Sequence, residues 1–185
     1  SIAYLEGFYY RPRIDKDVLR KYGSGLLALS GCLHGEVPSL ILSGREIDAL
    51  NACKEYQEIF GKENFYLELQ DHGLEEEKRV NQKFVELSRK EGIPLVATND
   101  VHYVDKEDAY AQEILLCIGT QKVIKDPTRL RFSTNEFYLK TPLEMQELFH
   151  DVPEALKNTI VIAEKCNVEL KFDTIHLPEY DTPKG

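Results

Sequence analysis

Apolar and polar positions alternate along the first 120 residues in a pattern that predicts parallel βα units. Short apolar runs at residues 25–30, 65–70 and 95–98 are typical of buried strands, because small or turn-forming residues bound them. Helical periodicity separates and follows these runs. Strands and helices that alternate at this spacing are typical of a parallel sheet, which carries its chemistry at the carboxyl ends of its strands.

Three helices are predicted in this part of the chain. The first lies near residues 46–60, with Ile47 and Cys53 on its apolar face. The second is long and highly charged, and Gly92 closes it, because glycine readily adopts the left-handed conformation that ends helices. The third covers residues 111–118.

Beyond residue 120 the alternation stops. Residues 122–131 hold four lysines or arginines and one aspartate, which gives a local charge of +3. Two further helices are predicted at 142–149 and 153–166, and the second begins at a proline in its first turn. We therefore expect three parts: a βα region at 1–120, a basic loop with helices at 121–170, and an extended linker at 171–185.

Composition narrows the class of protein. The 185 residues are 42% hydrophobic and 30% charged, a composition that argues against a disordered chain. The net charge of −9 argues against binding DNA by charge alone. No apolar run is long enough to span a membrane, and the start shows no signal peptide. Four well-separated cysteines favour a reducing compartment and a cytoplasmic protein.

The sharpest candidate site follows the third strand. If the strand continues through residue 102, Asp100 and His102 lie on the same side of it, and a carboxylate and an imidazole there can share a divalent metal or bind two adjacent ones. The alternative is that Asp100 caps a helix beginning near Lys106 while His102 lies on the surface. Spacing alone leaves both open.

Other polar residues near strand ends are weaker candidates. Cys32 follows the first strand and offers a thiolate, although a free cysteine is more often a small buried hydrophobe. Glu68 is expected to point into a packed layer, and His72 lies in an Asp-His-Gly turn where polar residues are ordinary. The remaining cysteines fall on apolar helical faces and are expected in the core: Cys53, Cys117 and Cys166.

An aromatic and basic cluster at residues 8–13 has two interpretations. Its tyrosines and arginines suit base stacking and phosphate contact on single-stranded nucleic acid. The alternative, which we favour from sequence, is a loop whose aromatic side chains pack on the wall of the βα region.

Several longer motifs, in order along the chain, make it resemble a known family. It is similar to the bacterial DNA polymerase III alpha subunits, in the second half of their N-terminal PHP (polymerase and histidinol phosphatase) domain. The segments that carry the resemblance are residues 7–15 (GFYYRPRID), 29–33 (LSGCL), 97–103 (ATNDVHY), 137–140 (FYLK) and 153–159 (PEALKNT).

The resemblance implies an α/β fold: a partial PHP-type βα barrel, followed by a mostly helical C-terminal segment. In that family Asp100 and His102 match the last Asp-x-His metal motif, and Cys32 falls where a ligand is often found. The cofactors implied are zinc or manganese ions in a complete PHP domain, and magnesium in a palm domain beyond this chain.

The function expected is that of a fragment of a replicative DNA polymerase. Its PHP domain either performs metal-dependent 3′–5′ exonuclease proofreading or supports DNA synthesis structurally. The first ligand motifs of the family have no counterpart here, so we expect this chain alone to be inactive and prone to self-association. The implied partners are DNA and replisome subunits. Two alternatives remain: a free-standing phosphoesterase of the histidinol phosphatase type, and a non-catalytic brace.

Overall fold

The centre of the molecule is an open sheet of three parallel strands. The structure is a computed structural model that describes residues 2–173, 175 and 177. The sheet has the order β3-β4-β5, as the strand pairing shows. The parallel βα architecture predicted from sequence is confirmed. The strands are β3 (Ala28–Leu29), β4 (Phe65–Leu69) and β5 (Leu95–Ala97).

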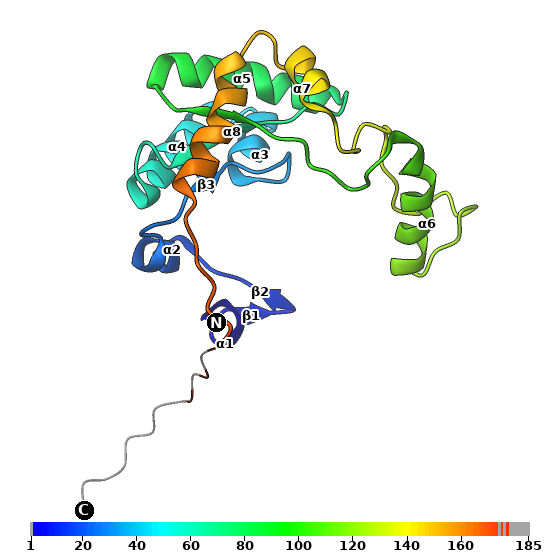
Figure 1. Cartoon of the computed structure of the whole chain (residues 1–185), viewed down its shortest axis with the longest axis horizontal. Helices are drawn as coiled ribbons and strands as arrows, with labels where there is room; N and C mark the ends of the chain where they lie inside the picture. Colours follow the sequence, from blue (N-terminus) through cyan, green and yellow to red (C-terminus); the bar gives the residue numbers. More distant parts are fainter. Residues whose placement is uncertain (1, 174, 176, 178–185) are drawn as a thin grey trace, which may run out of the picture.

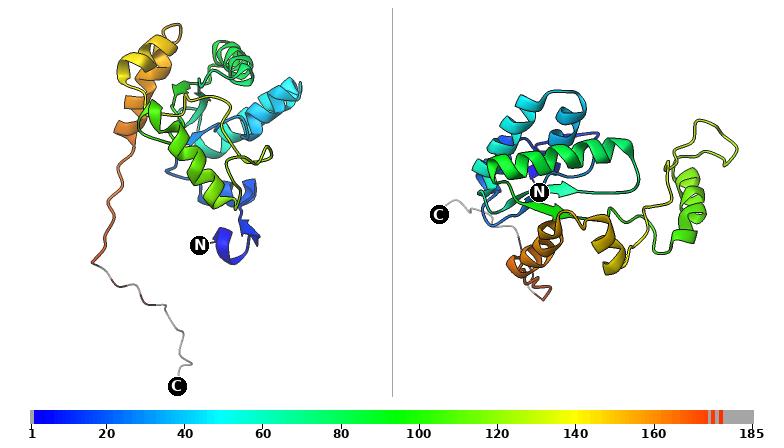
Figure 2. Two further views of the ribbon diagram at one scale, coloured as in Figure 1. Left: turned by 90° about the vertical axis from the view of Figure 1, so that its right-hand side faces the viewer. Right: turned by 90° about the horizontal axis from the view of Figure 1, so that it is seen from above.

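Helices make up most of the remaining structure. In Figures 1 and 2, α3, α4, α5 and α8 surround the strands, whereas α6 stands away from them. A short antiparallel hairpin, β1 (Phe8–Tyr9) and β2 (Arg11–Pro12), lies near the N-terminus. The helices are α1 (Ile2–Leu5), α2 (Lys16–Tyr22), α3 (Glu36–Leu42), α4 (Glu46–Phe60), α5 (Glu75–Glu91), the 3-10 helix η1 (Lys106–Asp108), α6 (Ala109–Gly119), α7 (Pro142–Leu148) and α8 (Pro153–Lys165).

The hydrophobic core lies between the strands and these helices. Phe65, Leu67 and Leu69 alternate along β4 and are fully buried on one face of the sheet. Phe84 of α5 and Ala155 of α8 pack into the same cluster, so helices distant in sequence cover one apolar face. α8 packs against β5, the edge strand opposite β3.

Local chemistry fixes the ends of the helices that frame this core. α5 begins with three glutamates at 75–77, which suit the positive end of the helix dipole. It ends at Gly92, whose φ of 70° lies in the left-handed region as predicted. α7 begins with a capping box, in which Thr141 and Glu144 each accept a hydrogen bond from the other's backbone N–H.

Two details of the predicted elements are wrong. The strand expected over residues 25–30 shrinks to two residues, and Leu29 is 40% exposed, because β3 is an edge strand that pairs only with β4 among the described residues. Ile47 was expected on the buried face of its helix but is largely exposed. The buried positions of α4 are Ala49, Ala52 and Cys53.

The aromatic cluster at residues 8–13 also differs from the favoured interpretation. Phe8, Tyr9 and Tyr10 are all more than half exposed on the hairpin, so they do not pack on the wall of the βα region. Most of the linker predicted at 171–185 lies outside the described residues. In the described part of the chain, every helix falls short of the length and apolar character that a bilayer crossing requires.

Candidate functional site

Glu68 joins the carboxyl ends of all three strands. It is the only charged residue in β4, and its carboxylate accepts hydrogen bonds from the Gly31 N–H (3.1 Å) and the Thr98 hydroxyl (2.5 Å). Gln70 donates to the same carboxylate at 3.0 Å, and the Glu68 N–H donates to the Ser30 hydroxyl at 2.9 Å. One acidic side chain therefore fixes the loops after β3 and β5 relative to β4.

The end of β4 carries a buried histidine. His72 is fully buried, and its backbone N–H and Nδ1 both lie within hydrogen-bond distance of the Glu77 carboxylate, at 2.6 and 2.7 Å. Because an ionised carboxylate only accepts, Nδ1 carries the proton. Burial by itself raises the pKa of Glu77, but the hydrogen bonds from His72 hold that pKa below its usual value. The pair attaches the strand end to the first turn of α5.

The end of β5 carries an accessible acid–histidine pair. The Asp100 Oδ1 and His102 Nε2 atoms are 3.4 Å apart, and the two side chains are 39% and 36% exposed. The strand itself ends at Ala97, so the loop, and not a continued strand, brings the two together. Capping does not explain Asp100, because Asp105 is the residue that caps the following 3-10 helix. Asp100 and His102 lie on the same side as expected, although the strand does not continue to residue 102. Of the alternative, the capping role of Asp100 is wrong, whereas the surface position of His102 agrees with the structure.

A second segment holds His102 in place. The His102 N–H donates to the Phe137 carbonyl at 2.8 Å, and the Leu139 N–H donates to the Val104 carbonyl at 3.1 Å. These bonds flank a parallel bridge between Tyr103 and Tyr138. The backbone around the acid–histidine pair is thus supported by a neighbouring extended segment.

Aromatic rings connect the buried histidine to the accessible one. The Phe137 ring stacks on His72 with a centroid distance of 4.1 Å and an interplanar angle of 5°. The same ring meets His102 edge-on at 5.6 Å, and Phe132 lies 4.7 Å from His102. The Thr134 hydroxyl donates to the His72 carbonyl at 2.8 Å. The end of β4 therefore supports the end of β5 through residues 132–137.

A buried lysine completes this support. Lys140 is almost fully buried, and its ammonium group donates to the Glu136 carbonyl and to Asn99 Oδ1, the latter at 3.3 Å. Burial lowers the pKa of Lys140 below its ordinary value of 10.5. The Asn99 amide in turn donates to the Tyr138 carbonyl at 2.9 Å. The residue before Asp100 is thereby fixed to the same segment that holds His102.

Cys32 lies apart from the acid–histidine pair in the described structure. It is partly buried in the turn after β3 and lines a small cavity with Glu68 and Gln70. Within residues 2–173, 175 and 177, no three histidine, cysteine, aspartate or glutamate side chains gather as a metal-binding group. The described residues therefore offer the accessible pair Asp100 and His102, and not a complete group of metal ligands.

The other cysteines follow expectation in two cases out of three. Cys53 and Cys117 are buried, and burial raises the pKa of the Cys53 thiol to about 12, so it is an inert core residue. Cys166 was expected in the core but is exposed, because α8 ends at Lys165 and the chain leaves the helix there.

Sequence reasoning undervalued Glu68 and His72. A signal for Glu68 was present, since a lone carboxylate in an otherwise apolar strand requires hydrogen-bond donors from neighbouring strand ends. His72 gave little signal, because its stacking partner Phe137 is distant along the chain.

Comparison with known proteins shows that the chain is similar to one part of DNA polymerase III alpha subunits. Residues 1–72 match the PHP domain, a range that includes Cys32 and His72 but not Asp100 or His102. DNA polymerase III subunit alpha of Borreliella burgdorferi is 53% identical over 184 residues, and that of Treponema pallidum is 49% identical over 183. The corresponding subunit of Thermus aquaticus is 46% identical over 191 aligned residues.

These alignments cover nearly all of this chain but little of the relatives. They include 99%, 99% and 100% of the chain respectively, and the chain spans 16% of the length of each of the three relatives. The similarity extends through α7 and α8, beyond the part that matches the PHP domain.

Proposed function

Because the chain belongs to the family of bacterial DNA polymerase III alpha subunits, we propose that it forms part of a replicative polymerase and contributes metal ligands to a site that hydrolyses phosphodiester bonds. The expected reaction is 3′–5′ removal of nucleotides from a DNA strand. Asp100 and His102 are the ligands proposed on this chain. DNA, other replisome subunits and a cytoplasmic location follow from the replicative role.

The observation that supports this proposal most strongly is the separation of the two donor atoms. Asp100 Oδ1 and His102 Nε2 are 3.4 Å apart. Two ligand atoms at about 2.0–2.1 Å from a tetrahedral zinc ion are about 3.3–3.4 Å from each other. A carboxylate oxygen and an imidazole nitrogen also suit manganese. The donor set and the distance between its two atoms therefore fit a divalent cation.

The chain's own residues prepare this pair for a cation. Both side chains are more than a third exposed, so a metal and a substrate can reach them. The Phe137 carbonyl fixes the backbone of His102, and Asn99 fixes the residue before Asp100. The cation would supply an activated water and would neutralise charge that develops on the phosphate.

Two ligands do not complete a catalytic site, so further ligands are required. Cys32 is proposed as an additional one, since it follows the end of β3, a strand of the same sheet, and lies in the part that matches the PHP domain. The rest would come from polymerase segments outside this chain, and this chain alone would not hydrolyse DNA. We assign residues 1–120 to the metal-binding region and 121–170 to the segment leading towards the polymerase palm, where magnesium would act.

A structural brace is the second candidate function. It is favoured by the fact that the described residues gather no group of three ligands, whereas the carboxylates of Glu68 and Glu77 each accept at least two hydrogen bonds that attach the strand ends to neighbouring segments. A free-standing phosphoesterase lacks comparable support, because the three relatives above are all polymerase subunits and match this chain through α8.

The full-length polymerase provides the test. Asp100→Asn keeps the size of the side chain and removes its charge, so we expect nuclease activity to fall at least about 100-fold, with polymerisation almost unchanged. Asp151→Asn is the matched control, because Asp151 forms an exposed pair with His150 (Oδ1 to Nε2, 3.1 Å) elsewhere on the surface. Equal nuclease activity in the parent and in Asp100→Asn would favour the brace.

A further inference from the structure

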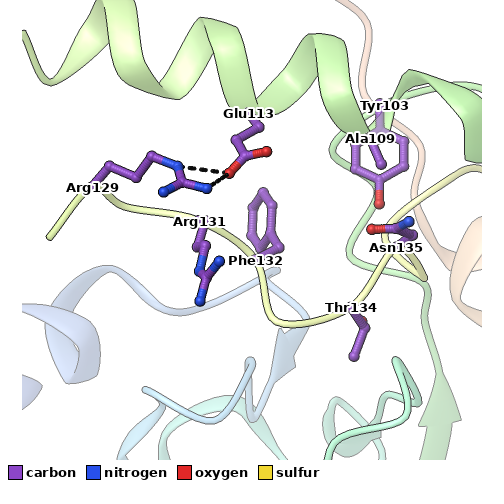
Figure 3. A pocket seen from close by; sticks show the side chains of 8 residues that line it. All are labelled: Tyr103, Ala109, Glu113, Arg129, Arg131, Phe132, Thr134 and Asn135. Carbon is purple, nitrogen blue, oxygen red and sulfur yellow. Dashed lines mark hydrogen bonds and ion pairs between the residues drawn. The ribbon is translucent and has the colours of Figure 1, made fainter. Parts of the chain in front are cut away.

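A cleft opens directly beside the proposed metal pair. Its volume is about 170 Å³, several times the space of about 30 Å³ that one water molecule occupies in the liquid. Figure 3 shows its walls, which come from the start of α6 and from the loop at residues 129–135. The side chains that matter most for its chemistry are those of Tyr103, Arg129, Arg131, Phe132 and Asn135.

One positively charged side chain in this cleft has no charged partner among the described residues. Arg129 is engaged through three nitrogens: its Nε donates to Glu113 at 2.8 Å, its Nη2 lies in an ion pair with the same carboxylate oxygen at 2.6 Å, and its Nη1 donates to the Asp126 carbonyl at 3.1 Å. Arg129 thereby neutralises the only carboxylate of the cleft. Arg131 forms no ion pair or hydrogen bond with any described residue, and in Figure 3 it points away from Glu113. The cleft therefore carries an uncompensated positive charge.

Polar groups and an aromatic ring lie within reach of the same space. Asn135 is exposed, and its side-chain amide makes no hydrogen bond to the described residues. Tyr103 accepts a hydrogen bond from the Phe137 N–H at 3.3 Å, which leaves its hydroxyl proton free to donate. An arginine fork with neutral donors beside it is the usual protein environment for a phosphate group.

Phe132 links the cleft to the metal pair. Its ring forms part of the cleft wall, and its centroid lies 4.7 Å from that of His102. A ligand in the cleft is thus separated from His102 by a single aromatic ring. Because phosphates repeat along a nucleic-acid strand, a strand held in the cleft can carry a neighbouring phosphate towards His102. Aromatic side chains such as Phe132 are the residue type on which bases stack.

We propose that this cleft binds a phosphate group of a single DNA strand, with Arg131 as the cation that holds it, while the neighbouring phosphodiester lies at Asp100 and His102. The choice of DNA as the ligand rests on the proposed function. The cleft itself rests on its unpaired arginine, its neutralised carboxylate and its position beside His102.

Photo-cross-linking of the full-length protein tests the cleft. A single-stranded oligonucleotide with 5-iododeoxyuridine near its 3′ end is bound in the presence of a chelator, so that no metal-dependent hydrolysis occurs. Peptide mapping by mass spectrometry then measures the cross-links to residues 126–140. Arg131→Gln is compared with Lys125→Gln, which removes the same charge from the same basic loop but does not line the cleft.

We expect Arg131→Gln to lower this cross-link about tenfold, because it loses a charge-assisted contact to phosphate. Lys125→Gln should change it less than about twofold. Arg131→Lys keeps the charge without the planar fork, so its cross-link yield should lie between those of the parent and Arg131→Gln. This variant also tests the cleft if Arg131→Gln folds poorly. Equal losses in Arg131→Gln and Lys125→Gln, or no loss in either, would overturn the proposal.

The same experiment separates this inference from the proposed hydrolysis. Asp100→Asn should retain the cross-link, because binding in the cleft needs no metal. A parent protein that cross-links at residues 126–140 through Arg131 but hydrolyses no DNA with metal present would overturn the hydrolytic function and support the cleft.

Discussion

The ends of β4 and β5 carry the same two residue types in opposite environments. After β4, Asp71 and His72 begin a turn in which the histidine is fully buried and bonded to Glu77. After β5, Asp100 and His102 face one another at 3.4 Å with more than a third of each side chain exposed. A strand-end histidine near an acid is therefore structural at one position and accessible to a ligand at the other.

The difference comes from what covers each ring. Phe137 lies flat on His72 and excludes water from it, whereas the same ring meets His102 edge-on and leaves its Nε2 atom beside Asp100. The His72 Nε2 atom is buried with no hydrogen-bond partner among the described residues. The burial and the Glu77 contacts of His72 suit a supporting role, whereas the exposure of His102 suits the metal-binding role proposed for it, and Phe137 connects the two rings.

Breaking the buried pair should have the largest effect on stability. Glu77→Gln removes the charged acceptor of two hydrogen bonds, and we expect it to lower the free energy of unfolding by about 2–3 kcal/mol. Urea unfolding followed by circular dichroism measures the loss. Glu76→Gln is the matched control, since Glu76 is exposed in the same first turn of α5 and should cost less than about 0.5 kcal/mol. Similar losses of unfolding free energy in Glu77→Gln and Glu76→Gln would show that the buried pair adds no more stability than an exposed glutamate of the same turn.

The contribution of Glu77 should also depend on pH. Its pKa in the folded protein is lowered below 4.5, so the folded state favours the ionised carboxylate. The stability it adds is then full above about pH 4.5 and is lost as pH falls through the lowered pKa. The difference in unfolding free energy between the parent and Glu77→Gln should therefore shrink as the pH falls below about 4.5. A difference that grows on acidification would contradict this assignment.

Some features of the fold could be predicted from local sequence patterns, and others depend on residues distant along the chain. The boundaries of α4 and the glycine stop of α5 follow from local periodicity and capping, and both agree with the structure. The two residues of β3 could not be predicted, because the length of an edge strand depends on pairing with β4. The burial of His72 was missed for the same kind of reason, since Phe137 covers it from far along the chain.

The candidate site likewise has one part that local sequence predicts and another part that it does not. The meeting of Asp100 and His102 was predicted from their spacing of two, although a loop brings them together rather than a strand. The segment at 132–140 that supports them, with its stacked ring and buried Lys140, could not be found by local pattern. The resemblance to the polymerase subunits is confirmed by relatives that align with nearly the whole chain.

The smallest expected effect concerns the connection between the two strand ends. Phe137→Leu removes the ring that contacts both histidines while keeping an apolar side chain, so we expect metal affinity of the full-length protein to fall about fivefold. A manganese titration followed by electron paramagnetic resonance measures it. Phe149→Leu is the control, because Phe149 is equally buried in the main core and touches neither ring. A larger loss in the control would show that general stability, not positioning, sets the affinity.

The most direct test of the account is cobalt(II) binding to the full-length protein, measured by visible absorption. We expect Asp100→Asn to lose the absorption bands of the bound ion with its unfolding free energy almost unchanged. Glu77→Gln should keep most of the bands although it is less stable. Asp100→Asn that binds cobalt as tightly as the parent would contradict the assignment of chemistry to the end of β5.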